Sequence, residues 1–465
     1  MIAMTLAEIA AVVGGTVDAT DDGGRTHVVD GAAYVDSRQR VPGGLFVAVA
    51  GERVDGHDFA EGAHAVLGSR PTGVPSVLVD DPVTALGVLA RHVVDLLPAT
   101  VLALTGSQGK TGTKDYLAQV LATAGPTVAT LGNNNNELGV PLTVLRADTT
   151  TAYLVVEMGA RGIGHIAYLC GIAPPRIAAV LNVGTAHVGE FGSREAIAVA
   201  KGEIVEALPV DGTAVLNAGD DLVAPMAART RATVSTFGDA GSGTVPDVAW
   251  RGVELDDLGR PSFEIGYAGD WQPVRLTQTG RHQVANAAAA AAMALATGLA
   301  LPDVAAALSA AASASPMRMD LRERADGLIV VNDAYNANPA SMVAAVDALV
   351  AIGGRSSRRT VAVLGEMKEL GDAADDSHRQ VGRHVAAAGV DVLLVVGEPA
   401  RGLADGAAAE PGWTGEAIVT AGRAEALLWV RENVSPQDVV LVKASRGAAL
   451  ESIADVLLEG EVTAR

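Results

Sequence analysis

Short apolar runs alternate with longer stretches of helical periodicity along most of the chain. The runs "VLAL" (101–104), "YLVV" (153–156) and "AAVL" (178–181) are each followed by polar or glycine residues. Uninterrupted apolar runs of this length are typical of strands that are buried on both faces of a parallel sheet. The repeated order of strand and helix therefore predicts an α/β fold in which helices pack over parallel sheets.

The chain has 465 residues, which is too long for one hydrophobic core. The segment "LLPAT" (96–100) separates a first region of short strands and turns from the strand that follows it. An Ala- and Ser-rich segment that ends at Pro316 has the composition of a linker, and apolar strands resume after it. We therefore expect three α/β domains: a small N-terminal domain (1–98), a central parallel-sheet domain (99–314) and a C-terminal Rossmann-like domain (315–465).

Charge and composition narrow the class of protein. The net charge of −20 argues against binding to nucleic acid and favours a soluble, cytosolic protein. The single cysteine excludes a disulfide framework, and the N-terminus lacks the basic segment of a signal peptide. The uncharged stretch 283–302 is rich in alanine and contains Gln283 and Asn286. We expect a packed core helix that ends at Gly298 rather than a membrane span.

The segment "TGSQGKTGTK" (105–114) has the features of a phosphate-binding loop. Its spacing, G-x-x-G-K-T, is two residues shorter than the usual G-x-x-x-x-G-K-[ST] pattern. An apolar strand precedes Gly106, and a helical pattern with Gly125 as its stop follows. Backbone N–H groups at such a turn bind anions, Lys110 would neutralise phosphates, and Thr111 would bind magnesium. The alternative is an ordinary turn with an exposed lysine.

Polar side chains follow several of the apolar strands. In open α/β sheets ligands bind beyond the carboxyl ends of strands, where Glu157, Asp333 and Lys443 are expected. The carboxylate of Glu157 suits a magnesium ion, which takes one or two carboxylates together with phosphate oxygens. His187 follows the strand "AAVL" and is either a further metal ligand or a loop histidine that caps a backbone group.

Two further features have both a structural and a functional interpretation. The four asparagines 133–136 form either a plain polar loop or a recognition loop for a phosphorylated ligand. In "SREAIAVAKGEIVEAL" (193–208) the steps from Ile197 to Lys201, Ile204 and Leu208 place Lys201 on the apolar face of a helix that opens at Ser193. Its ammonium either reaches a surface edge or belongs to a functional lysine with altered protonation.

Eight segments resemble the ATP-dependent Mur ligases of peptidoglycan synthesis, and the resemblance extends over essentially the whole chain. The Asn-rich loop and the "YNANP" run are similar to those of the member that adds D-alanyl-D-alanine. The short G-x-x-G-K-T loop is the form that the family uses. The segments are "DSRQRVPGGLFVAVAGERVDGHDF" (36–59), "TGSQGKTGTK" (105–114), "GNNNNELGVPLT" (132–143), "VVEMGARGIGHIAYL" (155–169), "LNVGTAHVGEFGSREAIAVAKGEI" (181–204), "DAYNANPASM" (333–342), "LGEMKELGDAADDSH" (364–378) and "LVKASRGAALE" (441–451).

The resemblance implies a role for individual residues. The implied catalytic residues are Lys110, Glu157, His187 and Lys201, and the implied magnesium ligands are Thr111, Glu157 and His187. The implied ATP-binding residues are Gly106, Ser107, Gln108, Gly109, Lys110, Thr111, Gly112, Asn286, Arg318 and Asp333. The uridine-diphosphate substrate would contact Ser37, Arg38, Asn135 and Asn136, and the acceptor pocket would contain Tyr335, Asn336, Asn338, Lys443, Ser445 and Arg446.

The implied reaction uses ATP and Mg²⁺ to join D-alanyl-D-alanine to UDP-N-acetylmuramoyl-tripeptide through an acyl phosphate. In related ligases the lysine that matches Lys201 is often carbamylated, and the same modification is expected here. Closure of the domains over the acyl phosphate is expected, because water would hydrolyse it. We expect a cytoplasmic monomer without nucleic-acid partners or a membrane span. Gly112, His165 and Ala444 depart from the family pattern, which puts local geometry in doubt.

Three alternative functions remain open from the sequence. A sibling ligase that adds the third residue of the stem peptide would carry a DNPR motif, and the chain contains none. Folylpolyglutamate synthase shares the short loop, but the N-terminal segment 36–59 argues against it. A regulatory P-loop NTPase would hydrolyse ATP without the dipeptide, so phosphate release that requires D-alanyl-D-alanine separates it from a ligase.

Overall fold

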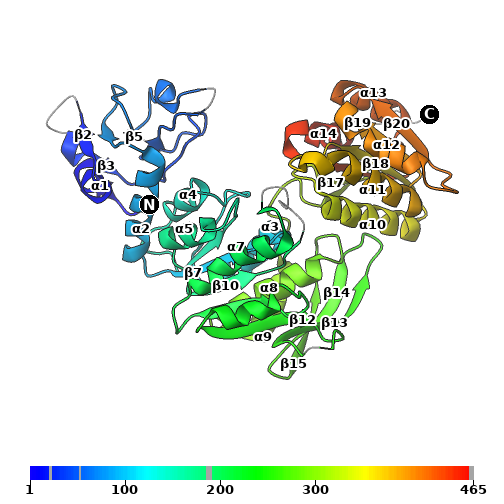
Figure 1. Ribbon diagram of the computed structural model, residues 1–465, viewed down its shortest axis with the longest axis horizontal. Coiled ribbons are helices and arrows are strands. Elements are labelled where there is room, and N and C mark those ends of the chain that lie inside the picture. Colours follow the sequence, from blue (N-terminus) through cyan, green and yellow to red (C-terminus); the bar gives the residue numbers. More distant parts are fainter. Residues whose placement is uncertain (20–23, 52–53, 185–190, 244, 460–465) are drawn as a thin grey trace. The chain divides into compact units, whose positions relative to one another are not determined.

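The computed structural model describes residues 1–19, 24–51, 54–184, 191–243 and 245–459 (Figure 1). The chain forms two compact units, each built from several segments. The predicted boundaries near residues 98 and 314 do not coincide with the limits of these units, and they stay predictions. The first unit comprises residues 1–183, 195–237 and 289–299, and the second comprises 184–194, 238–288 and 300–465.

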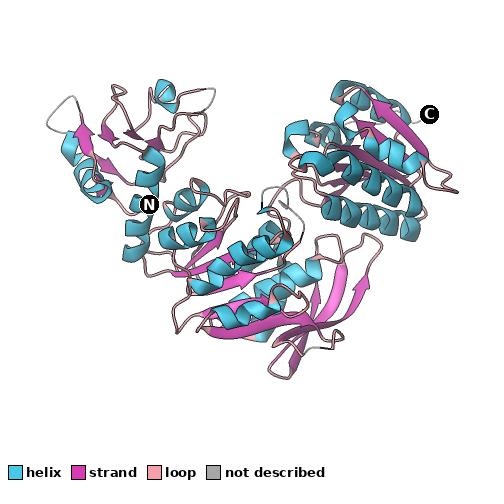
Figure 2. Ribbon diagram, in the orientation of Figure 1, coloured by secondary structure: helices cyan, strands magenta, loops and turns pink. Residues whose placement is uncertain are grey.

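The N-terminal part of the first unit contains a small sheet of four strands, flanked by two helices (Figure 2). Thr5 and Glu8 form a capping box that starts the first helix, and Asp81 caps the second. A two-stranded pair, β1 (Met4–Thr5) and β3 (Val28–Val29), lies beside the first helix. In spatial order the sheet is β2 (Thr16–Asp18), β6 (Ser76–Leu78), β5 (Ala65–Gly68) and β4 (Leu45–Val47), and the helices are α1 (Leu6–Val13) and α2 (Pro82–Leu96).

The rest of the first unit is the predicted parallel sheet. From β7 the chain passes to β8 and β9 on one side and then crosses to β10, β11 and β12 on the other. This reversal of direction beside β7 is the position at which open α/β sheets bind ligands. The spatial order is β12 (Thr233–Asp239), β11 (Thr213–Asn217), β10 (Ile177–Val180), β7 (Thr100–Thr105), β9 (Tyr153–Glu157) and β8 (Thr127–Ala129). The helices are α3 (Lys110–Ala122), α4 (Gly139–Val144), α5 (His165–Ile172) and α7 (Arg194–Glu206).

Three antiparallel strands in the second unit were not expected from the sequence, which we interpreted as a continued alternation of strands and helices. They are β13 (Val248–Leu255), β14 (Pro261–Tyr267) and β15 (Asp270–Arg275). Ala268 and Gly269 form the turn between β14 and β15, with φ values of 52° and 91°. Two central residues with positive φ are typical of the tight hairpin turn that matches strand twist. The alternation of apolar and polar residues in 261–267 was the signal for this hairpin.

The C-terminal part of the second unit is a six-stranded sheet in which only the edge strand β16 is antiparallel. This confirms the expected C-terminal α/β architecture. In spatial order the strands are β16 (Asp320–Glu323), β17 (Ile329–Asn332), β21 (Asp438–Lys443), β18 (Arg359–Gly365), β19 (Val392–Val396) and β20 (Glu416–Thr420). The helices are α10 (Pro339–Ser356), α11 (Ala374–Ala387), α12 (Gly402–Ala408), α13 (Arg423–Asn433) and α14 (Glu451–Glu459).

Alternate residues of these strands point into two separate cores, one on each face of the sheet. Val331 and Leu441 pack with residues of α10, α11 and α12 on one face. Val330 and Val440 pack with residues of α13 and α14 on the other. Because both faces are covered, the strands consist of almost uninterrupted Val, Leu and Ile, which is the pattern that the sequence displays.

The alanine-rich stretch 283–302 contains the expected packed helix, which ends before Gly298, and its last two residues begin a second helix. Helix α8 (Gln283–Leu295) contains fully buried alanines, and α9 (Leu301–Ala310) starts after a turn in which Gly298 has φ 95°. Across the described ranges no helix has the length and apolar character needed to cross a membrane.

Two neighbouring glycines of α10 offer a matched test of this packing. A Cβ at Gly353 would lie 2.3 Å from Cγ2 of Thr360, whereas a Cβ at Gly354 would meet nothing within 4 Å. We expect Gly353→Ala to destabilise the protein by about 1–3 kcal/mol through overpacking. Gly354→Ala should stabilise it by about 0.5–1 kcal/mol, because alanine is the better helix former. Thermal unfolding of the two variants beside the unchanged protein measures the difference, and equal melting temperatures would contradict the packing described.

Candidate functional site

The predicted phosphate-binding loop is formed as strand, turn and helix. It joins β7 to α3, which begins at Lys110. Gly109 immediately before the helix has φ 78°, a conformation that favours glycine. A Cβ at Gly106 would lie 2.9 Å from Cβ of Leu181, so the loop approaches β10 too closely for a side chain there. Ser107 and Gln108 lie between the two glycines, and Gly112 lies in the first turn of α3.

Asn182, which follows β10, fixes the conformation of this loop. Its amide oxygen accepts from the N–H of Gln108 at 2.9 Å, and its amide nitrogen donates to the carbonyl of Gln108 at 3.1 Å. The N–H of Ser107 donates to the carbonyl of Asn182 at 3.1 Å. Asn182 directly follows the apolar run 178–181, but the sequence gives no sign of this role, because the pairing depends on β7 and β10 being neighbours.

Lys110 folds back over the loop. Its ammonium donates to the carbonyl of Gly106 at 2.8 Å. The charge therefore lies above the turn, where the N-terminus of α3 and the loop N–H groups also favour an anion. This confirms the predicted local geometry of the loop, while the role of Lys110 in catalysis stays a prediction.

Glu157 lies at the end of β9 and is 1% exposed. One of its carboxylate oxygens accepts from the hydroxyl of Thr111 at 2.9 Å, and the other accepts from the side-chain amide of Asn135 at 2.7 Å. The structure therefore brings together the loop threonine, the strand-end carboxylate and one of the four consecutive asparagines. Thr111 and Glu157 were both expected to bind magnesium, and the resemblance placed Asn135 against the uridine-diphosphate substrate; these roles stay predictions.

Thr130 contacts Glu157, and Lys114 contacts Thr130. Neither residue was nominated for the site from the sequence. The hydroxyl of Thr130 accepts from the N–H of Glu157 at 3.0 Å. The buried Lys114 donates to the carbonyl of Thr130 at 2.8 Å and pairs with Asp115. Lys114 occurs within the loop motif, so its position in α3 was predictable, but its burial was not.

Lys201 is buried on the apolar face of α7, as predicted. It is 6% exposed, and Ile197, Ile204 and Leu208 are also buried. Burial, followed by the effect of the nearby Lys110 ammonium, lowers the pKa of Lys201 well below its usual value. The burial argues against a side chain that reaches the surface, and a functional role for Lys201 stays a prediction.

Glu203, on the same helix, holds the segment that follows Glu157. Its carboxylate accepts from the N–H groups of Gly164 and Ala167 at 2.5 and 2.9 Å, at the N-terminus of α5. The nearby Cys170 is buried, and burial followed by the charge of Glu203 raises the pKa of its thiol to about 12. His165, which departs from the family pattern, pairs with Glu137: its Nε2 lies 3.2 Å from a carboxylate oxygen of Glu137.

His187 lies outside the described residues, so its predicted role as a metal ligand stays a prediction. Elsewhere in the described chain, no three His, Cys, Asp or Glu side chains gather in a group that could hold a metal ion. Glu157 and Thr111 supply hard oxygen atoms beside a phosphate-binding loop, which is the chemistry that magnesium requires when phosphate oxygens and water complete its shell.

The predicted uridine-diphosphate contacts are in two places. Ser37 and Arg38 follow Asp36, and the Arg38 side chain, followed by the Arg38 N–H, lowers the pKa of Asp36 to about 2. The Arg38 side chain is 87% exposed, and its guanidinium pairs with the Asp36 carboxylate at 2.8 Å. The side-chain oxygen of Asn136 accepts from the N–H of Gly139, the first residue of α4, at 3.0 Å.

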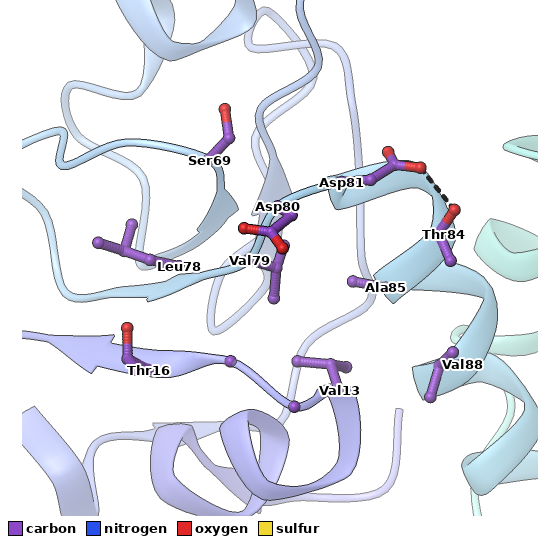
Figure 3. Close-up of a pocket in the computed structure, with 12 residues that line it drawn as sticks. Val13, Thr16, Ser69, Leu78, Val79, Asp80, Asp81, Thr84, Ala85 and Val88 are labelled. Carbon is purple, nitrogen blue, oxygen red and sulfur yellow. Dashed lines mark hydrogen bonds between the residues drawn. The ribbon is translucent and has the colours of Figure 1, made fainter.

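A cavity of about 480 Å³ lies between α1, β6 and α2 (Figure 3). Asp81 lines it but is already engaged, because it accepts from the hydroxyl of Thr84 at 2.5 Å and from the N–H of Val83 at 3.0 Å. The cavity contains none of the residues that the sequence nominated. We assign no function to it.

In the second unit, Asp333 and Lys443 form an ion pair at the ends of β17 and β21. Their charged atoms are 2.6 Å apart, and their side chains are 13% and 3% exposed. The ammonium of Lys443 also donates to the carbonyl of Asn336 at 2.7 Å, and Asp333 accepts from the N–H of Met319 at 3.0 Å. Removing one member of a pair this buried costs about 3–5 kcal/mol, so both residues have a structural role.

Arg318 lies next to this ion pair, in a strained segment. Its guanidinium is 4.2 Å from the ring centre of Tyr335, and that of Arg446 is 5.9 Å from the same ring. The flanking residues Met317 and Met319 have φ values of 60° and 48°. Residues other than glycine rarely adopt this left-handed backbone conformation, and such strain tends to occur at functional sites.

The remaining nominated residues make contacts within the protein. Asn338 caps α10 by accepting from the N–H of Ser341 at 2.9 Å. The hydroxyl of the buried Ser445 accepts from the N–H of Lys368 at 2.9 Å. Asn286, in α8, donates to the side chain of Gln283 at 3.0 Å. Lys368 was not nominated, although its segment 364–378 was one of those that carried the resemblance.

The chain matches two family models. Residues 104–294 match the Mur ligase middle domain, and residues 317–446 match the Mur ligase, glutamate ligase domain. These spans contain the phosphate-binding loop and the Asp333–Lys443 pair, respectively.

Curated relatives and solved structures match over nearly the full length. UDP-N-acetylmuramoyl-tripeptide–D-alanyl-D-alanine ligase of Mycobacterium tuberculosis is 46% identical, over 98% of each chain, and that of Escherichia coli is 35% identical, over 99% of each. MurF from Acinetobacter baumannii superposes with a TM-score of 0.85 at 32% identity, covering 98% of this chain and 99% of that one. MurF ligase from Thermotoga maritima in complex with ADP gives 0.75 at 29% identity, over 92% and 97%. The chain therefore belongs to the Mur ligase family.

Proposed function

We propose that the protein joins D-alanyl-D-alanine to UDP-N-acetylmuramoyl-tripeptide at the expense of ATP. The terminal carboxylate of the tripeptide takes the γ-phosphoryl group and ADP leaves. The amine of the dipeptide then attacks the acyl carbon, and inorganic phosphate and a proton are released. The similarity to ligases of this name over 98% of both chains supports the assignment, because it includes the C-terminal sheet as well as the nucleotide loop.

The residues of the loop support the phosphoryl-transfer part of the proposal. Gly106, Gly109 and Lys110 would surround the terminal phosphates of ATP, whose negative charge a strongly acidic protein must neutralise locally. By family resemblance, Asn286 contacts the adenine, while Arg318 and Asp333 contact the nucleotide. Ser37 and Arg38 contact the uridine end of the substrate.

Thr111 and Glu157 are the proposed magnesium ligands, together with His187. The contact of 2.9 Å between the Thr111 hydroxyl and the Glu157 carboxylate places two hard oxygen donors beside the loop. A bound magnesium ion neutralises phosphate charge. Asn135 keeps the second oxygen of Glu157 in place by donating a hydrogen bond to it. The role of Asn135 is then orientation of this carboxylate.

Lys201 is the proposed site of a carbamate. A neutral lysine amine forms an N–C bond with carbon dioxide and releases one proton, which leaves an anion at the former position of the cation. The lowered pKa of Lys201 favours the neutral amine that this reaction needs. The repulsion between Lys201 and Lys110 would also become an attraction. Lys201 would then contribute a negative charge near the proposed magnesium ligands.

The acceptor pocket is proposed at the carboxyl ends of β17, β18 and β21. The Lys443 ammonium donates to Asp333 and to the carbonyl of Asn336, so its proposed contribution is to hold these loops. Tyr335, Asn336 and Arg446 are partly or fully exposed and are the proposed direct contacts of the dipeptide. Asn338 and Ser445 would shape the pocket through their hydrogen bonds.

The assay that tests the proposed function is release of phosphate from ATP. We expect release to require both D-alanyl-D-alanine and a nucleotide-linked tripeptide, supplied in parallel with diaminopimelate or lysine as its third residue. Substitution of the dipeptide by either of these single amino acids should abolish release. ATP hydrolysis at full rate without the dipeptide would instead identify a regulatory NTPase, and activity with a single amino acid would identify a sibling ligase.

Lys110→Ala should lower turnover by at least ~10²-fold, the scale of losing one preorganised charge contact in a transition state. Arg91, an exposed residue that pairs with Asp95 on α2, offers a charge-matched control, and Arg91→Ala should leave turnover nearly unchanged. Steady-state phosphate release measures both. A Lys110→Ala enzyme with near-normal turnover would exclude the phosphate role.

Lys201→Ala should be inactive whether the lysine acts as a cation or as a carbamate. The two possibilities differ in the sign of the charge, so small ions in the vacated space can separate them. If Lys201 is carbamylated, acetate should partly restore turnover, and activity of the unchanged protein should depend on dissolved carbon dioxide. Restoration by short amines but not by acids would show that Lys201 acts as a cation.

A further inference from the structure

The segment Glu366–Lys368 follows β18 at the carboxyl end of the C-terminal sheet, and three consecutive residues of it are anchored. The N–H of Ser445 donates to the carbonyl of Glu366, and the N–H of Lys368 donates to the hydroxyl of Ser445, both at 2.9 Å. Between these contacts, the N–H of Met367 donates to Nε2 of His378 at 2.9 Å. Ser445 therefore holds two residues of the segment and His378 holds the one between them.

His378 is buried and both of its ring nitrogens are engaged. It lies in α11, is 2% exposed, and its Nδ1 is 2.7 Å from the carbonyl of Ala374. Because Nε2 accepts from an N–H group, the ring proton is on Nδ1, which donates to Ala374. Gly402 packs against the Cβ of His378, since a Cβ at position 402 would lie only 2.9 Å from it. The ring is therefore fixed in one neutral form and one orientation.

The anchored segment is connected to the other loops at this end of the sheet through Ser445. The Ser445 hydroxyl accepts from Lys368 and lies 3.4 Å from the carbonyl of Ala337, to which it donates. Ala337 belongs to the loop after β17 that also carries Tyr335 and Asn336. A shift of Met367 away from His378 would thus move the segment after β18 and loosen its contacts to the loops after β17 and β21.

We propose that His378 is a positioning residue for binding of the acceptor dipeptide. By accepting from Met367 it holds Glu366–Lys368 against Ser445 and so fixes the shape of the acceptor pocket. This inference rests on the proposed function, which assigns that pocket to D-alanyl-D-alanine. His378 was not among the residues nominated from the sequence, although it is the last residue of the segment 364–378.

Two substitutions separate the functions of the ring nitrogens. Asparagine at this position places a donor near Nδ1 and retains the contact to Ala374, but it is too short to accept from Met367. Glutamine reaches the position of Nε2 and can accept from Met367. We expect His378→Asn to raise the KM for D-alanyl-D-alanine by about 10-fold, the scale of a buried N–H that loses its acceptor. His378→Gln should bring this KM back to within about 3-fold of the original value.

The KM values for ATP and for the nucleotide-linked tripeptide are measured together with the KM for the dipeptide. For both variants these two values should stay within about 2-fold of those of the unchanged protein. His384→Asn is the control, because His384 is on the same helix and pairs with Asp347 away from the pocket. Equal effects of asparagine and glutamine, or equal rises in all three KM values, would reduce His378 to a general structural role and overturn the proposal.

Hydrogen exchange in the unchanged protein gives a second measurement that needs no variant. In the presence of ADP and the nucleotide-linked tripeptide, adding D-alanyl-D-alanine should slow exchange in the peptide that covers 366–369. Unaltered exchange at a saturating dipeptide concentration would contradict the proposal. Ser445→Ala separates the proposed acceptor pocket from the proposed role of His378. If Ser445→Ala raises the KM for the dipeptide and His378→Asn does not, the location of the pocket is supported and the role of His378 is wrong. If the unchanged protein shows no dipeptide-dependent activity, the proposed function itself fails.

Discussion

A carboxylate that is buried away from water is stable only if nearby donors or cations replace its hydrogen bonds to water. Glu157 is such a carboxylate, at the end of a central strand of the parallel sheet. Thr111 and Asn135 donate to its two oxygens, and Thr130 accepts from its N–H. These three residues come from the helix after β7 and the loop after β8, so both must reach the end of β9. The neighbouring order of β8, β9 and β7 satisfies this requirement.

Local patterns predicted the residues whose environment depends on their own element. The spacing of Ile197, Lys201 and Ile204 placed Lys201 on the apolar face of its helix, although it left open whether the ammonium reached the surface. The short glycine loop likewise predicted a strand, a tight turn and a helix. Partners from distant segments were not predictable in this way: the donors to Glu203 are Gly164 and Ala167, and only the packing of α7 against the start of α5 brings them together.

The resemblance named the residues of the acceptor pocket but not the contacts that each of them makes. Lys443, Asn338 and Ser445 were all expected to line the acceptor pocket, and each makes hydrogen bonds within the protein. A polar residue at a strand end can either contact a ligand or hold the loop that does, and the sequence is the same in both cases. The antiparallel strands between 248 and 275 were missed for another reason, because a period of two was overlooked within a chain dominated by buried parallel strands.

Cys170 has a practical consequence that follows from its surroundings. The chain contains no other cysteine, and the thiol is buried with a pKa raised to about 12, so it is almost entirely protonated at neutral pH. Thiolate is the reactive form, and thiol-directed probes should therefore pass over it. A cysteine introduced at an exposed position such as Val210 would carry a fluorophore or spin label selectively. Pairs of such labels would report distances within the working enzyme without prior removal of native thiols.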